Sequence, residues 1–157
     1  MIVASAVATH WSPENDQDTN VRLLTEGSID HLKSRILAND ASWYLSISTS
    51  GYEERQFDAS RAANWAFFPL FPWLWKSLLS LGADAAWSGF LLSNVLFLLG
   101  LIQLHRWVQT IRDTDVADRA VLVIALFPTA YFFSLPWSES LFLFLASSTL
   151  ISLQQKQ

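Results

Sequence analysis

The chain has 157 residues, of which 52% are hydrophobic and 15% are charged, with eight Trp and eleven Phe. This apolar share exceeds that of ordinary soluble domains and the charged share falls well below theirs, so the composition favours a membrane protein. The net charge of −4, with ten scattered Lys and Arg, argues against nucleic acid as a partner, and the lack of cysteine in the sequence excludes disulfides, thiolate metal sites and thiol catalysis.

The first 65 residues are predicted to be a short apolar start followed by a long polar loop. Residues 1–11 are either the stub of a first helix or a true start, and 12–65 form the loop. Apolar residues recur at helical spacing over 29–37, which predicts a short amphipathic helix. Asn39 or Asp40 then offers an N-cap for a second short helix, which Gly51 would end.

The rest of the chain is predicted to be embedded in a membrane. Residues 66–81 are apolar but contain Pro69, Pro72, Lys76 and two Trp, a pattern that predicts a juxtamembrane or re-entrant helix. Long uncharged runs follow, and about 20 such residues cross a hydrocarbon core about 30 Å thick. They predict three spanning helices, at 84–105, 118–135 and 138–154, with the last two forming a tight antiparallel hairpin.

The predicted fold class is therefore all-α, a polytopic integral membrane protein with about three spanning helices and short amphipathic helices in its first extracytoplasmic loop. The short 105–119 connection holds Arg106, Arg112 and Arg119, which favours the cytoplasm. The 12–65 loop and the turn at 136–139 would then share the opposite side. Polar residues far apart in sequence are expected to meet there.

Four segments together resemble the PIG-V-type mannosyltransferases, a family of GT-C membrane glycosyltransferases. They are NDASWYLSISTSGY (39–52), NWAFFPLFPWL (64–74), LLSN (91–94) and LFPTAYFFSLPWSESLFLFLA (126–146). The resemblance covers roughly residues 30–153. It implies a GT-C-like enzyme that adds mannose from a polyprenyl-phosphate carrier, with a catalytic carboxylate in the first extracytoplasmic loop. In this sequence that carboxylate falls on Asp40.

The family has a full spanning helix before this loop and several spans after the last matching segment. We therefore expect residues 1–157 to be one incomplete GT-C domain, an N-terminal portion or fragment of the enzyme. The resemblance implies an integral membrane location, in the plasma membrane of a prokaryote or the endoplasmic reticulum of a eukaryote, with an extracytoplasmic active face. No cofactor is expected beyond the polyprenyl-phosphate sugar, which is the donor substrate.

The expected partners are the lipid bilayer, the lipid-linked sugar, and either a partner membrane subunit or the remaining part of the enzyme. An alternative from a different class stays open. In that alternative the chain is a non-catalytic membrane scaffold or partner subunit, whose aromatic runs serve only as anchors.

Asp40 is the predicted catalytic base. A sugar attached through phosphate already has a good leaving group, so transfer with inversion needs mainly one base to take the proton of the acceptor hydroxyl. The alternative is that Asp40 simply caps a helix. Both can hold, since a helix N-terminus stabilises a carboxylate.

The other candidates are predicted to bind substrate. Glu139 either lies in water at the surface or turns inward to bind sugar hydroxyls or an acceptor amine, and Ser138 either shares that task or caps a helix. Glu53 is an acid of the site or a solvated loop charge. Arg61, like Arg55, is a phosphate partner or a surface charge. Trp43 and Tyr44, with Phe67, Phe68 and Phe71, form an aromatic wall for the polyprenyl chain or anchor the interface.

No metal site is predicted. Asp16, Asp18 and Asn20 resemble the start of an EF-hand loop, but the required Gly and Glu are replaced by Val21 and Gly27. The three histidines are dispersed. Ser93 and Asn94, inside an apolar run, are expected to bond to a neighbouring helix rather than to substrate.

Overall fold

The computed structural model describes residues 27–56 and 58–154, which divide into two units, 27–32 and 33–154. The predicted stub at 1–11 and the loop residues 12–26 lie outside the described residues. Residues 27–36 are helical, in agreement with the amphipathic helix predicted over 29–37. The unit of residues 33–154 carries the candidate site and is described by itself below.

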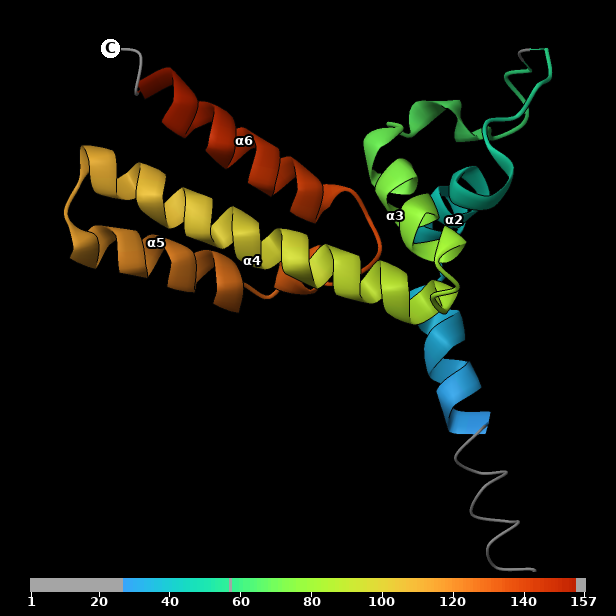
Figure 1. Cartoon of the computed structure of the whole chain (residues 1–157), viewed down its shortest axis with the longest axis horizontal. Coiled ribbons are helices and arrows are strands. Elements are labelled where there is room, and N and C mark those ends of the chain that lie inside the picture. Colours follow the sequence, from blue (N-terminus) through green and yellow to red (C-terminus); the bar gives the residue numbers. More distant parts are fainter. Residues whose placement is uncertain (1–26, 57, 155–157) are drawn as a thin grey trace, which may run out of the picture. The chain divides into compact units, whose positions relative to one another are not determined.

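The second unit is built from helices and turns (Figure 1). In chain order its elements are α2 (Asp40–Ser50), the 3₁₀ helix η1 (Asn64–Ala66), α3 (Leu70–Ser80), α4 (Ala85–Ile111), α5 (Thr114–Leu126), the 3₁₀ helix η2 (Ala130–Phe133) and α6 (Glu139–Gln154). The described residues contain no strand, which confirms the all-α class.

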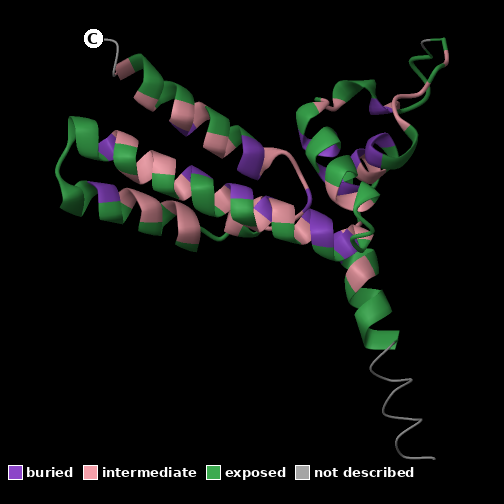
Figure 2. Ribbon diagram, in the orientation of Figure 1, coloured by how far each residue is buried: buried purple, intermediate pink, exposed green. Residues whose placement is uncertain are grey.

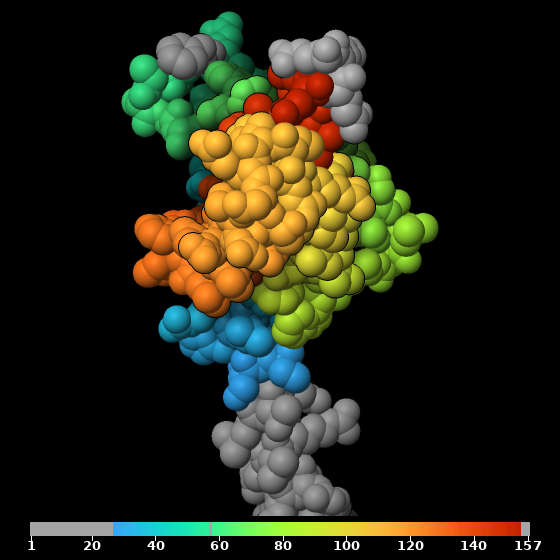
Figure 3. All heavy atoms as spheres, turned by 90° about the vertical axis from the view of Figure 1, so that its left-hand side faces the viewer, coloured from blue at the N-terminus to red at the C-terminus, as the bar shows by residue number. Residues whose placement is uncertain are grey.

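Helix α4 is central because both α5 and α6 pack against it (Figure 1). It runs parallel to α6: Gln103 bonds to Ser148 at 3.4 Å, and Thr110 donates to Gln154 at 2.6 Å. Gly100 permits the close approach, since an added Cβ would lie only 3.0 Å from Leu143. Figure 3 shows the end of α6 in red beside the yellow and orange atoms of the α4–α5 connection.

The apolar run predicted as one span over 118–135 is divided in the structure. Helix α5 ends at Leu126, and Phe127 has an extended backbone with φ −63° and ψ 139°. Pro128 explains the break, because proline lacks an N–H and disfavours helical geometry in the residue before it. The 13 residues of α5 measure about 20 Å. The predicted hairpin of two long spans is therefore replaced by α5, η2 and α6, with α5 and α6 each packed on α4.

Within the described part of the chain, α4 is the one helix long and apolar enough to cross a membrane. Its 27 residues measure about 40 Å. It continues past the predicted end at 105, so the connection between α4 and α5 consists of Arg112 and Asp113 rather than the predicted 105–119. The Asp113 side chain caps α5 by accepting from Val116 N at 2.9 Å. Helix α6 is apolar but has 16 residues, about 24 Å. One described helix therefore has the length and composition of a span, and the predicted count of three is not confirmed.

Helix α3 begins at Leu70 rather than at 66, since Phe67 is extended and Pro69 occupies the N-cap position. Its Trp75 is fully buried and donates to Ser88 Oγ at 3.1 Å, which joins α3 to the start of α4. Its outer surface is exposed (Figure 2), with Trp73 59% accessible. An 11-residue helix measures about 16 Å, too short to cross a bilayer about 30 Å thick.

Candidate functional site

Asp40 is the first residue of α2 and is exposed. Asn39 takes the N-cap position with a positive φ of 56°, a conformation that Asn tolerates better than most residues. The Asn39 carbonyl accepts from both the backbone N and the hydroxyl of Ser42, at 3.0 and 2.6 Å. Asp40 therefore stands in the first helical turn, and its carboxylate is accessible.

Tyr44, one turn further along α2, joins this helix to the start of α6. Its phenol donates a 2.7 Å hydrogen bond to Ser138 Oγ, 94 positions away in sequence. Phe67 and Phe71 contact the Tyr44 ring edge-on at 4.9 and 5.3 Å. Burial raises the pKa of the phenol, the Ser138 hydrogen bond opposes this shift, and negative charge on Glu139 adds to it. Tyr44 therefore remains a protonated donor at neutral pH.

Glu139 is the first residue of α6 and directly follows Ser138. Its Oε2 is buried and has no hydrogen-bond partner among the described residues. Burial raises the pKa of the Glu139 carboxyl, and the Asp40 carboxylate adds to this shift. The Tyr44–Ser138 hydrogen bond brings the starts of α2 and α6 together, so the two predicted acids stand at the same end of the helices. They differ in exposure, since Asp40 is exposed and Glu139 Oε2 is buried.

An apolar groove of about 500 Å³ opens beside Glu139. Phe68, Pro69 and Leu70, which lead into α3, form one wall. The first turns of α6 form the other, and Ser138 and Glu139 provide its polar end. The groove is therefore a largely greasy surface with a carboxylate at one end, an arrangement that fits an amphiphile.

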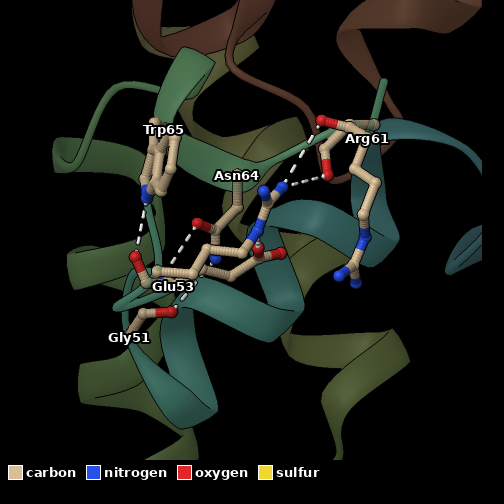
Figure 4. Close-up of polar contacts among 7 residues, drawn as sticks. Gly51, Glu53, Arg61, Asn64 and Trp65 are labelled. Atoms are coloured by element: carbon tan, nitrogen blue, oxygen red, sulfur yellow. Dashed lines mark hydrogen bonds and ion pairs between the residues drawn. The ribbon is translucent and has the colours of Figure 1, made fainter. Parts of the chain in front are cut away.

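A network of hydrogen bonds organises the connection from α2 to η1 (Figure 4). Asn64 is 1% exposed, and its Oδ1 accepts from the backbone N of Glu53 at 3.0 Å while its Nδ2 donates to the Gly51 carbonyl at 3.1 Å. Trp65 Nε1 donates to the Glu53 carbonyl at 2.7 Å. Asn64 thus ties both ends of the connection together.

The same network separates two predicted substrate ligands. Glu53 is engaged by Arg55, whose Nε lies 2.5 Å from its carboxylate and whose guanidinium lies over the Trp65 ring at 5.1 Å. Arg61 contributes only its carbonyl, which accepts from Arg55 at 3.4 Å, and Figure 4 shows its guanidinium pointing away from the network. Arg61 lines a hollow of about 330 Å³ beside Trp65. Of the two arginines considered, Arg61 has the accessible guanidinium.

The predicted aromatic wall is partly a packing core. Trp43 stacks on Phe67 with ring centroids 6.0 Å apart, and Phe71 is buried beneath Tyr44. Phe68, in contrast, is 80% exposed and lines the groove. Only Phe68 among these aromatics is therefore both open to the surface and placed along the groove.

Two polar residues of the apolar segments have structural roles. Asn94 bonds reciprocally with Ser134 at the end of η2, donating to its carbonyl at 3.2 Å and accepting from its hydroxyl at 3.1 Å, as predicted. The same prediction is wrong for Ser93, whose Oγ is buried without a hydrogen-bond partner among the described residues. Asn64 was not predicted as a clamp, although an Asn beside a run of aromatics is a usable signal of a buried, paired amide.

Over the described residues, no cluster of His, Asp or Glu is placed to hold a metal ion. The Asp16–Asn20 segment lies outside them.

The described residues form a helical protein with one apolar helix long enough to cross a membrane and an apolar groove that ends at Glu139. Residues 12–157 match the family model described as Mannosyltransferase (PIG-V), so the chain belongs to that family. No match was found among curated proteins or among solved structures. This match confirms the resemblance to the PIG-V-type mannosyltransferases that the sequence motifs indicated.

Proposed function

We propose that the chain forms the catalytic face of a membrane mannosyltransferase of the GT-C type. It moves mannose from a polyprenyl-phosphate donor to a lipid-linked or glycan acceptor, with inversion at the anomeric carbon. The observation that carries the proposal is the position of Asp40 in a chain of the PIG-V family: it is accessible in the first turn of α2, and Tyr44 of the same helix bonds to Ser138, which precedes a second acid.

The proposed reaction needs one base. Asp40 takes the proton of an acceptor hydroxyl as that oxygen forms a bond to the anomeric carbon, and the bond between this carbon and the phosphate oxygen breaks. The polyprenyl phosphate leaves with the electron pair of the broken bond. Asp40 is exposed in the first turn of α2, so an acceptor hydroxyl can reach its carboxylate.

Arg61 is the proposed partner of the donor phosphate. A guanidinium matches the paired oxygens of a phosphate, and the Arg61 side chain is exposed above a hollow while Arg55 is held by Glu53. Glu53 therefore acts in this proposal by ordering the loop. Tyr44, through Ser138, holds the start of α6 beside α2.

The active face is proposed to be extracytoplasmic. Helices α4 and α6 run parallel, and Tyr44 of α2 bonds to Ser138, so α2 and the 134–139 turn are placed on one side of the membrane in this proposal. The short connection between α4 and α5, which contains Arg112, lies at the other end and is assigned to the cytoplasm. Labelling of a cysteine introduced at Ser42 by an impermeant maleimide in intact cells tests this assignment. Labelling only after permeabilisation would place α2 in the cytosol and end the proposal.

The reaction is tested by Asp40→Asn, measured as mannose transfer from a polyprenyl-phosphate donor in membranes containing the chain with its natural partners. We expect loss of transfer by at least about 100-fold, in the range contributed by a general base, with unchanged membrane insertion. Asp115→Asn is the matched control, since Asp115 is an exposed acid in the first turn of α5 at the opposite end. Full transfer by Asp40→Asn would remove this residue from the mechanism. Transfer that continues without the chain would favour the scaffold alternative.

A further inference from the structure

The groove beside Glu139 differs from a plain lipid-facing surface because a carboxylate stands at its end. Its volume of about 500 Å³ falls in the range of about 300–1,000 Å³ typical of ligand pockets. Phe68, Leu70, Phe142 and Leu145 supply apolar walls. A hydrocarbon chain lying along these side chains would bring its head group to Ser138 and Glu139.

The polar end of the groove selects for a hydrogen-bond donor. Glu139 Oε2 is buried without a partner among the described residues, and a buried acceptor is stabilised by a ligand that donates to it. Ser138 Oγ already accepts from the Tyr44 phenol, so its own proton is free to point toward a ligand. Ser138 and Glu139 together can therefore donate to and accept from a single hydroxyl.

The same end disfavours a phosphate. Glu139 stands at this end, and Asp40 lies in the first turn of α2, which Tyr44 joins to Ser138, so an anionic head group placed there would face acidic side chains. The lysine and arginine side chains are not among the residues that line this groove. The phosphate-bearing donor is therefore a poor occupant, while a hydroxyl or an ammonium group is a good one.

We propose that this groove is the binding site of the acceptor lipid, with its chain along Phe68, Phe142 and Leu145 and a donating head group, hydroxyl or ammonium, on Glu139. This inference deepens the proposed transfer function and rests on it for the role of the bound lipid as acceptor. The bound head group would lie on the Asp40 side of α6, where the proposed base acts.

Binding is tested with three photoprobes that share one diazirine-bearing alkyl chain and carry a glucoside, a primary amine or a phosphate. The 157-residue chain is reconstituted in phosphatidylcholine nanodiscs, and cross-links are mapped by mass spectrometry. We expect the glucoside and the amine to label residues 138–145 about tenfold more than the phosphate, as one charge-assisted hydrogen bond gained or lost allows. Equal labelling by all three probes would mean an unselective lipid surface and would overturn the proposal.

Two variants separate the head-group contact from the apolar walls. Glu139→Gln removes the charge but keeps an acceptor oxygen, so amine labelling should fall about tenfold while glucoside labelling changes less than about threefold. Leu145→Trp should fill the groove and lower labelling by both. Leu150→Trp, an exposed position on the same helix outside the groove, is the control and should leave it unchanged. Labelling that ignores Leu145→Trp would overturn the site.

The labelling needs neither a donor nor turnover, so it is independent of the transfer reaction. Asp40→Asn should retain selective labelling even where it abolishes transfer. If transfer proves independent of Asp40 while labelling follows the expected pattern, the proposed base is wrong and the groove stands. Unselective labelling together with an inactive Asp40→Asn would instead remove the groove and leave the base.

Discussion

The Asn64 clamp offers the sharpest test of how the loop beside the candidate site is held. Asn64 is 1% exposed and pairs with the backbone of both Glu53 and Gly51. Asn64→Ala removes both bonds and leaves a backbone N–H and a carbonyl without partners. Each unpaired buried group costs about 1–3 kcal/mol, and because these groups are only partly buried we take about 2–4 kcal/mol for the pair.

This energy applies to local opening of the loop rather than to global unfolding. A cost of about 2–4 kcal/mol corresponds to an increase of about 30- to 900-fold in the population of the open loop. The suitable reporter is the backbone amide of Phe67, which bonds to the Asn64 carbonyl at 3.2 Å and is not itself removed by the substitution. Its hydrogen exchange, measured by mass spectrometry in nanodiscs, should accelerate by this factor.

Gln56→Ala is the control, because Gln56 is exposed on the same loop. If the Phe67 amide accelerates less than about threefold in Asn64→Ala, the clamp does not govern opening. The loop would then be held by other contacts, such as the hydrogen bond from the Tyr52 hydroxyl to the Phe67 carbonyl at 2.6 Å.

Two further predictions concern contacts that join the elements. A double-mutant cycle of Tyr44→Phe and Ser138→Ala, with the free energy of unfolding measured by chemical denaturation, should give a coupling energy of about 0.5–1.5 kcal/mol. A coupling energy within about 0.3 kcal/mol of zero would show that this hydrogen bond does not hold α6 to α2. The Lys33 ammonium, 2.8 Å from Asp84, lowers the pKa of this carboxyl below its usual 3.8, so the pair stabilises the fold above that pH and its contribution is lost as pH falls through the lowered pKa. Asp84→Asn keeps an N-cap for α4 but should flatten the acid dependence of the melting temperature below pH 4, and an unchanged profile would contradict the assignment.

The short helices of the polar half were predictable because their signals are local. Helix α2 begins at Asp40 and ends before Gly51, which has a positive φ of 85°, a conformation that favours glycine. The position of Asp40 in the first turn follows from the same local pattern. Its choice as catalytic residue came from the family resemblance, since capping residues alone carry no information about chemistry.

The division of the 118–135 run was predictable only in part. Hydropathy treats Phe127 and Pro128 as apolar and so joins α5 to η2, whereas the backbone cost of Pro128 separates them. The packing partner of α6 could not be predicted from composition either. It depends on Gly100, which has no Cβ and so lets Leu143 approach α4.

The position of Glu139 at the same end as Asp40 depends on the same topology. Since α5 returns along α4 and α6 then runs parallel to α4, the turn at 134–139 comes back to the end where α2 lies, and Tyr44 bonds to Ser138. A glycosyl transfer with inversion from a phosphate donor uses a single base, so two acids at one site need different tasks. Exposure separates them: Asp40 is open to an incoming hydroxyl, while Glu139 Oε2 is buried at the end of an apolar groove. The accessible acid therefore suits proton removal, and the buried acid suits recognition of the lipid that brings the hydroxyl.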